Sequence, residues 1–219
     1  MENFEHIFFD FDGTIMNTSE GVFEGFDRVR EYFNIELEDK SVYNTMIGPP
    51  LYESFDRVFH LTGKELEKGI EVFHDYYTPI GLYKCKLYDE VAPLIKKLKA
   101  AGKKIYVATS KPEVYARQLL QKFGIDSLFD FIGGVDMEGV RRDKIDVIRY
   151  VMDTNNLNDV KEQCLMLGDT HYDIDGAKLA GLKSMGILWG FGSEKSLRES
   201  GADYIAKDAA HVYEILTGE

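Results

Sequence analysis

Two aspartates near the start of the chain have the type and spacing that cation or acid–base chemistry requires. Asp10 and Asp12 follow the apolar run Ile7-Phe8-Phe9 and precede Gly13. On an extended chain, side chains two positions apart leave the same face, roughly 6–7 Å from each other. Such a pair binds a hard cation, and while the cation neutralises one carboxylate the other can exchange protons. The pair alone predicts a cation site, whatever the purpose of that site.

Two further apolar runs end in polar residues. Thr109 and Ser110 follow one of them, and Asp169 follows the other after Gly168. In an open parallel sheet, ligands bind beyond the carboxyl ends of the strands. If these runs are strands of one sheet, we expect Asp10, Thr109 and Asp169 to meet at one edge.

The polar residues near these ends also have structural interpretations. Thr109 and Ser110 offer a hydroxyl and backbone N–H groups to a phosphate, but a Ser N-cap without a ligand has the same sequence. Asp173 and Asp175 stand near a predicted helix start, where a carboxylate contributes about 0.3–1 kcal/mol without binding anything. We prefer that structural interpretation for Asp175.

Lys144 and His171 are not selected by spacing alone. An isolated Lys near a helix start is usually solvated. His171 is a candidate acid or base, but it belongs to no pairing pattern, so we interpret it as a loop or supporting residue.

Short apolar runs alternate with helical patterns from about residue 85 onward. This alternation predicts an α/β fold with a parallel, doubly wound sheet and right-handed connections. The predicted strands are Ile7–Asp10, Lys104–Thr109, Phe129–Gly133, Cys164–Leu167, Lys183–Ile187 and Asp203–Ile205. The predicted helices span about 91–101, 145–152, 174–180 and 209–216, with a further one opened by Pro112.

Residues 16–82 interrupt the alternation. They show helical periodicity, as at Val22, Phe26 and Val29, and no convincing strand. We therefore predict a helical domain at 16–82 inserted into a core domain made of 1–15 and 83–219. The aromatic residues of the insertion are interpreted as its core.

Composition excludes several classes of protein. A formal net charge of −12 over 219 residues disfavours polymeric nucleic acid and membranes as partners.

The N-terminus lacks the pattern of a signal peptide, so we expect a cytoplasmic protein. Cys85 and Cys164 are too few for a disulfide framework or a thiolate metal site. Walker and dinucleotide fingerprints are absent from the sequence, and Gly190-Phe191-Gly192 is interpreted as a loop near the mouth of the site.

Together, the motifs Asp10-Phe11-Asp12-Gly13-Thr14, Thr109-Ser110, Lys144 and Gly168-Asp169 with Asp173 resemble the four ordered motifs of the haloacid dehalogenase superfamily. The resemblance runs nearly end to end. It implies a Rossmann-like core with a helical cap inserted after the first strand, and a phosphatase that uses Mg²⁺ and a small phosphomonoester.

The resemblance also implies how the carboxylates act. Asp10 attacks phosphorus to form an aspartyl-phosphate, while Asp12 protonates the leaving oxygen and then activates water. Asp10, Asp169 and the carbonyl of Asp12 surround the magnesium.

The remaining motif residues are implied to hold the phosphate. Thr109 and Lys144 bind the phosphoryl oxygens, Ser110 supports them through its backbone, and Asp173 orients Lys144 or a metal-bound water. A transferring phosphoryl group carries negative charge that a cation and a Lys must balance.

Additional segments resemble the phosphoglycolate phosphatase-like branch, particularly its members described as 5′-nucleotidases. These segments are Gly48-Pro49-Pro50-Leu51, Val107 to Pro112, Gly139-Val140-Arg141 and Leu188-Trp189-Gly190. The branch implies a nucleoside 5′-monophosphate or phosphoglycolate as substrate. For Arg141, which matches an Arg of those relatives, a site role and a structural role both stay open.

Other functions stay open beside the phosphatase. A dehalogenase would want a non-acidic residue where this chain has Asp12. A sugar phosphomutase has both aspartates and would be recognised by isomerised sugar phosphate without steady phosphate release. A non-catalytic magnesium-binding regulator is the alternative from another class, whereas the spacing of an EF-hand fails beyond Asp12. The sequence does not indicate an oligomeric state.

Overall fold

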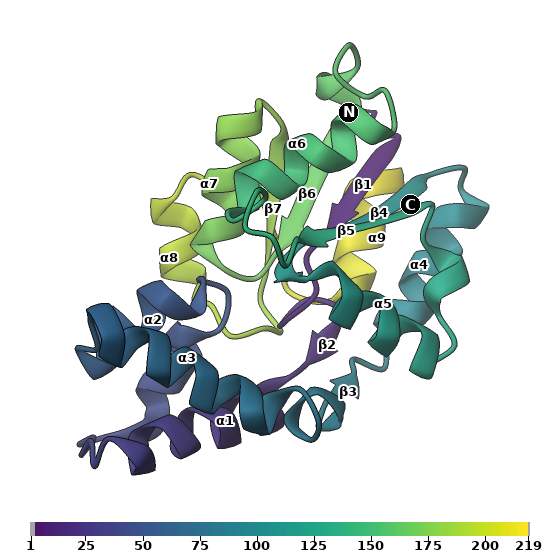
Figure 1. The fold of residues 1–219 in the computed structure, drawn as a ribbon. Coiled ribbons are helices and arrows are strands. Elements are labelled where there is room, and N and C mark those ends of the chain that lie inside the picture. Colours follow the sequence, from purple (N-terminus) through teal and green to yellow (C-terminus); the bar gives the residue numbers. More distant parts are fainter. Residues whose placement is uncertain (1–2, 219) are drawn as a thin grey trace. The chain divides into compact units, whose positions relative to one another are not determined.

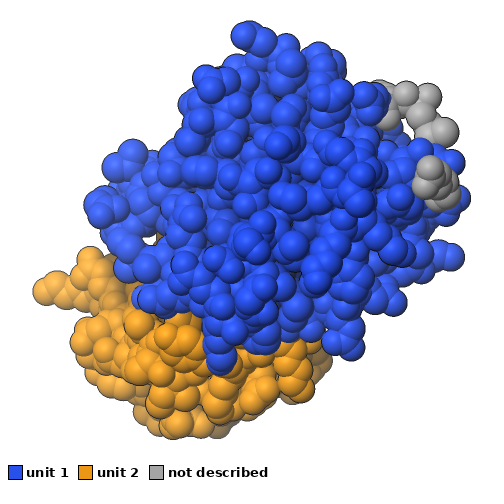
Figure 2. All heavy atoms as spheres, turned by 90° about the vertical axis from the view of Figure 1, so that its right-hand side faces the viewer, with its two compact units in different colours: residues 1–16, 87–219 blue, residues 17–86 orange. Residues whose placement is uncertain are grey.

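The computed structural model describes residues 3–218 and divides into two compact units. Residues 1–16 and 87–219 form the first, called the core unit, and residues 17–86 form the second, called the helical unit. Figure 2 colours the core unit blue and the helical unit orange. The role of the helical unit as a cap stays a prediction.

The core unit is built on a six-stranded sheet in the order β5-β4-β1-β6-β7-β8, with every neighbouring pair parallel. This confirms the predicted doubly wound α/β fold, because the strand order runs outward in both directions from β1. The strands are β1 (His6–Phe9), β4 (Lys104–Pro112), β5 (Phe131–Val135), β6 (Cys164–Gly168), β7 (Lys183–Ile187) and β8 (Tyr204–Ala206).

Helices cover both faces of this sheet. Figure 1 shows α6, α7 and α8 on one side of the strands and α4, α5 and α9 on the other. On the first side, Phe8 and Met166 of the sheet pack with Val147 and Val151 of α6 and Ala177 of α7, all of them buried. The helices are α4 (Val91–Ala100), α5 (Glu113–Lys122), α6 (Lys144–Thr154), α7 (His171–Ala180), α8 (Glu194–Glu199) and α9 (Ala209–Thr217).

Two strands, β5 and β4, have bounds that differ from the prediction by more than one residue, for local reasons. β5 begins at Phe131 rather than Phe129, because the preceding residues form a 3₁₀ turn at Asp126–Leu128 and the Asp130 carboxylate accepts the N–H of Ile105 at 2.9 Å. β4 continues past Thr109 to Pro112 through a bulge in its pairing with β5. The short helix α8 was not predicted.

A second sheet contains only two short strands, β2 (Met16–Asn17) and β3 (Lys86–Leu87). These strands contain the two points where the chain passes from one unit to the other. They were not predicted, because two residues are too few for a period-2 pattern.

The helical unit consists of α1 (Ser19–Tyr32), α2 (Leu51–Phe59) and α3 (Gly63–Tyr77), with 3₁₀ turns at Lys40–Met46 and Gly81–Tyr83. Its interior is aromatic. Phe26 is fully buried, and its ring lies 5.3 to 5.9 Å from the rings of Tyr43, Phe55 and Phe73. Rings at these distances and tilted to one another pack favourably. Across residues 3–218, no helix is long and apolar enough to cross a membrane.

Candidate active site

The central strand of the sheet delivers Asp10 to the site. β1 pairs with β4 on one side and β6 on the other, and the N–H of Asp10 continues the ladder by donating to Leu167 O at 2.9 Å. Asp10 is therefore fixed by the backbone at the point where the strand ends. Only 2% of Asp10 is exposed.

Lys144 links Asp10 to Asp173. Its Nζ lies 2.6 Å from Asp10 Oδ1 and 2.7 Å from Asp173 Oδ1, and it donates to Ala108 O at 3.3 Å. Lys144 is the first residue of α6, where Asp143 and Asp146 form a capping box. The helix start thus places a buried ammonium group between two carboxylates from different segments.

Asp173 is held by the start of α7. Thr170 donates its backbone N–H and its hydroxyl to Asp173 Oδ2 at 3.0 and 2.9 Å, which completes a capping box. One oxygen of Asp173 therefore caps the helix, and the other faces Lys144. The structural role considered for this residue and its place beside the site coexist.

Asp169 sits in a cradle of glycines. Thr14 Oγ1 donates to its Oδ1 at 3.2 Å, and the N–H of Phe191 donates to its Oδ2 at 2.7 Å. A Cβ added to Gly13 or Gly190 would lie 2.2 or 2.3 Å from Asp169 Oδ2. Gly13 also has φ of +83°, so both its conformation and its contact with Asp169 require glycine.

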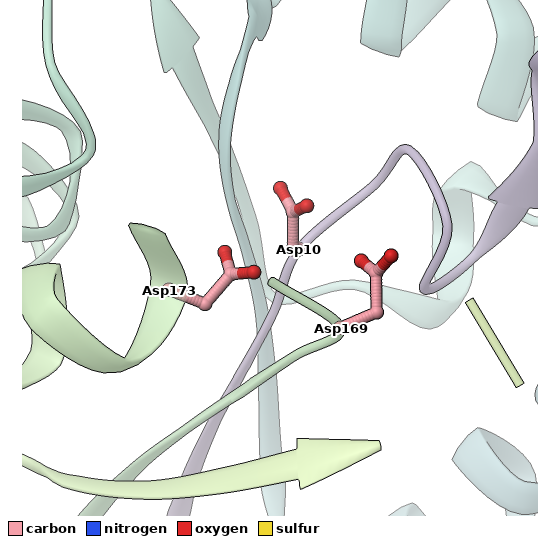
Figure 3. Close-up of side chains that lie close together, drawn as sticks. All are labelled: Asp10, Asp169 and Asp173. Atoms are coloured by element: carbon pink, nitrogen blue, oxygen red, sulfur yellow. The ribbon is translucent and has the colours of Figure 1, made fainter. Parts of the chain in front are cut away.

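Three buried carboxylates meet at this place. Asp10, Asp169 and Asp173 offer oxygens that all lie within 4.8 Å of one another. Figure 3 shows them side by side, carried by the end of β1, the loop after β6 and the start of α7. The family resemblance implied Asp10, Asp169 and the carbonyl of Asp12 as metal ligands. In the structure, the third carboxylate of the group is that of Asp173.

Burial opposes the ionised form of the carboxyl groups in this cluster. Burial raises the pKa of Asp10 to about 7, against the pull of Lys144. Burial, with the charges of Asp173 and Asp10, raises the pKa of Asp169 well above its usual range. Burial opposes the charged form of Lys144, but the attraction of Asp10 and Asp173 outweighs it and raises that pKa. Three carboxylates facing one ammonium group fit a divalent cation with oxygen ligands.

Asp12 is not a member of this group of three carboxylates and pairs with Lys111. Lys111 Nζ lies 3.1 Å from Asp12 Oδ1 and 3.4 Å from Oδ2. Lys111 lies in the segment from Val107 to Pro112 that resembles the phosphatase branch, but it was not predicted as a site residue. Tyr88 is a second unselected neighbour: burial, with the charges of Asp169 and Asp12, raises its pKa to about 12.

The other predicted residues lie as follows. Thr109 is buried at the end of the regular part of β4, where its Oγ1 accepts the N–H of Lys111 at 3.1 Å. Ser110 follows it and is partly buried. His171 is the first residue of α7, with its ring 4.1 Å from that of Tyr172.

Arg141 lies in the loop between β5 and α6 and contacts residues of β5, α5 and α6. Its Nε donates to Gly134 O at 3.1 Å, and its guanidinium lies 3.9 Å from the centre of the Tyr150 ring. An Nη also lies 3.4 Å from Glu113 Oε2. These contacts connect the loop to β5, α5 and α6, and both the structural role and the site role of Arg141 stay open.

Comparisons with known proteins find one matching family model and relatives whose names give different activities. A family model described as haloacid dehalogenase-like hydrolase matches residues 7–187. A 5′-nucleotidase of Pseudomonas aeruginosa is 31% identical over 213 residues, which cover 97% of this chain and 96% of that protein. The tyrosine-protein kinase PtkA of Mycobacterium tuberculosis is 31% identical over 206 residues, covering 94% of this chain and 67% of that protein.

Among solved structures, a predicted phosphatase from Clostridium acetobutylicum superposes with a TM-score of 0.93. It is 33% identical and covers 99% of this chain and 100% of its own. A phosphoglycolate phosphatase of Colwellia psychrerythraea is a more distant relative, 27% identical with 91% of each chain covered.

Proposed function

The chain belongs to the haloacid dehalogenase-like hydrolases and is a phosphatase of that family, and from this premise we propose that it hydrolyses a small phosphomonoester with Mg²⁺ through an aspartyl-phosphate on Asp10. One observation carries the proposal: buried Asp10, Asp169 and Asp173 converge beside Lys144 at the end of the central strand.

In the first step, the Asp10 carboxylate attacks phosphorus as the ester P–O bond breaks, and Asp12 gives its proton to the leaving oxygen. In the second, Asp12 takes a proton from water, which attacks the phosphorus and releases Asp10 and phosphate. The covalent intermediate divides one difficult displacement into two easier ones.

Charge balance decides how a carboxylate can attack a phosphate dianion. Asp10, Asp169 and the carbonyl of Asp12 would hold Mg²⁺, which would supply positive charge at the transferring phosphoryl group when bound. Lys144 supplies more, held beside Asp10 by Asp173, while Thr109 and the backbone of Ser110 bind phosphoryl oxygens. Each residue thus stabilises charge that grows as the phosphoryl group moves.

The direct test uses p-nitrophenyl phosphate with Mg²⁺. We expect the wild type to release nitrophenol steadily and Asp10→Asn to lose more than about a thousandfold in kcat, as removal of a covalent nucleophile does. Asp175→Asn is a matched control, because Asp175 is exposed on the same helix as Asp173. Undiminished turnover by Asp10→Asn would overturn the mechanism.

For the substrate, we propose a nucleoside 5′-monophosphate or phosphoglycolate, in line with the names of the relatives. A panel of both esters, phosphotyrosine and hexose phosphates, ranked by kcat/KM, tests this. Isomerised hexose phosphate without phosphate release would indicate a mutase instead. No turnover of any ester, with Mg²⁺ still bound, would indicate a regulator.

A further inference from the structure

Lys111 and Asp12 form a largely buried ion pair, in which the ammonium group of Lys111 contacts both carboxylate oxygens of Asp12. The distances from Nζ are 3.1 and 3.4 Å, and the two side chains are 4% and 16% exposed. Contact with both oxygens restrains the plane of the carboxylate as well as its position. A Lys this deeply buried is rare without a partner, and the carboxylate of Asp12 contacts its ammonium group.

The backbone of β4 aims Lys111 at the site. The pairing of β4 with β5 shifts register between Thr109 and Pro112, and Lys111 lies within this bulge. Bulges beside active sites commonly redirect a side chain. A Cβ on Gly134 would lie 2.5 Å from Lys111 O, so a glycine on β5 is what lets the bulged backbone come this close.

The two buried lysines contact different carboxylates. Lys144 contacts Asp10 and Asp173, whereas Lys111 contacts Asp12. When all four carboxyl groups, Asp169 included, are ionised, they and the two ammonium groups leave two negative charges, the charge that one divalent cation neutralises. Lys111 therefore pairs with Asp12, the carboxylate that is not part of the group Asp10, Asp169 and Asp173.

We propose that Lys111 is a positioning residue that holds Asp12 in the orientation from which it protonates the leaving oxygen. The inference rests on the proposed function, in which the ester P–O bond breaks as the bond from Asp10 to phosphorus forms. Asp12 must carry a proton when the ester binds; it gives that proton to the departing oxygen in this step and is left as the carboxylate that pairs with Lys111. Without Lys111, the carboxylate loses its fixed direction, and proton transfer depends on that direction.

The leaving group distinguishes this role from binding of the phosphate. p-Nitrophenolate departs without a proton, whereas benzyl alcohol, of similar size, requires one. We expect Lys111→Met to lower kcat/KM for benzyl phosphate by about 10- to 100-fold, the range for a misplaced acid, and for p-nitrophenyl phosphate by less than about 3-fold. Equal losses for the two esters with a higher KM would mean that Lys111 binds substrate, and would overturn the proposal.

Two further variants guard against trivial outcomes. Lys96→Met removes an exposed Lys of α4 and is expected to change neither ester. If Lys111→Met does not fold, Lys111→Arg keeps the buried charge with a different shape, and it is expected to slow benzyl phosphate selectively by a smaller factor. Equal losses in Lys111→Arg would equally overturn the proposal.

A double-mutant cycle supplies an independent readout. If Lys111 acts through Asp12, the substitution Lys111→Met has no further effect on benzyl phosphate in an Asp12→Asn background. A full additive loss there contradicts the inference. Failure of the proposed function is distinct, because the wild type would then turn over neither ester.

Discussion

The two units of the protein bury different chemistry. The core unit buries Asp10, Asp169, Asp173, Lys144 and Lys111 near the ends of its strands. The helical unit buries aromatic rings around Phe26. Its ion pairs are more exposed than those of the site: Lys68 and Glu71 are 38% and 60% exposed, and Arg30 and Asp27 are 24% and 29% exposed. Both units have a packed interior. Among the described residues, only the interior of the core unit contains a cluster of charged side chains.

The difference shows where folding stability has been given up for function. Removing several charged groups from water costs more free energy than surface pairs return, so a cluster of them persists only where surrounding structure fixes it. In the core unit, strand ends, capping boxes and glycines provide that structure. Such conflict between local stability and buried charge is typical of functional sites.

Loss of the metal should have the largest effect. We expect EDTA to stop turnover of p-nitrophenyl phosphate and Mg²⁺ to restore it, because the excess negative charge of the core unit is then uncompensated. Mg²⁺ should also raise the thermal midpoint of the wild type, since binding to the folded state alone stabilises it. Asp169→Asn should lose this shift, and Asp175→Asn should keep it. Full activity of the enzyme in EDTA would mean that the buried carboxylates of the core unit do not act through a metal.

The next largest effect concerns the interior of the helical unit. Phe26→Ala should destabilise that unit by about 3–5 kcal/mol, the usual cost of emptying a buried aromatic site. Phe23, which is only partly buried in the same cluster, provides a control in Phe23→Ala with a smaller loss.

The single tryptophan, Trp189, makes the two units separable in this experiment. It belongs to the core unit, where its Nε1 donates to Thr14 O at 3.1 Å. In denaturant, Phe26→Ala should shift the transition seen by far-UV circular dichroism more than the transition seen by Trp189 fluorescence. Equal shifts would mean that the units unfold as one.

Much of the core unit and of its site could be predicted because the signals are local. Apolar runs ending in polar residues predicted the strands, and their common edge predicted that Asp10 and Asp169 meet. Lys144 needed the family resemblance, since nothing in its neighbours distinguishes it from a solvated Lys.

Other features depend on geometry that no short pattern encodes. Lys111 reaches Asp12 only because β4 bulges where Gly134 permits, and a bulge has no reliable sequence signal. The contact of Phe191 N–H with Asp169 joins segments 22 positions apart through a loop whose course periodicity does not describe. In the helical unit, periodicity identified the buried Phe26, but it did not assign α1, α2 and α3 as separate helices.

The smallest expected effect comes from Asp130, at the opposite end of the sheet from Asp10. Burial favours the neutral form of both carboxylates, but in Asp130 the N–H of Ile105 and the ammonium of Lys99 outweigh burial and hold its pKa below the usual value. A carboxyl group with a depressed pKa stabilises the folded state at pH values above its unfolded pKa, about 3.9. That contribution disappears as the pH falls through the lower, folded pKa.

Asp130→Asn should therefore lower the free energy of unfolding by about 1 kcal/mol near neutral pH, the value of a hydrogen bond to a charged group that is partly solvated. The difference from wild type should stay constant between about pH 5 and 7 and shrink below about pH 4, where the wild-type carboxylate gains its proton. Denaturant unfolding at several pH values measures it, with exposed Asp159→Asn as the control. A difference that grew toward low pH would mean that the pKa of Asp130 is raised, as it is for Asp10. In that case Asp130 would not stabilise the fold through its charge, and the contrast between Asp130 as a stabilising carboxylate and Asp10 as a chemical one would not hold.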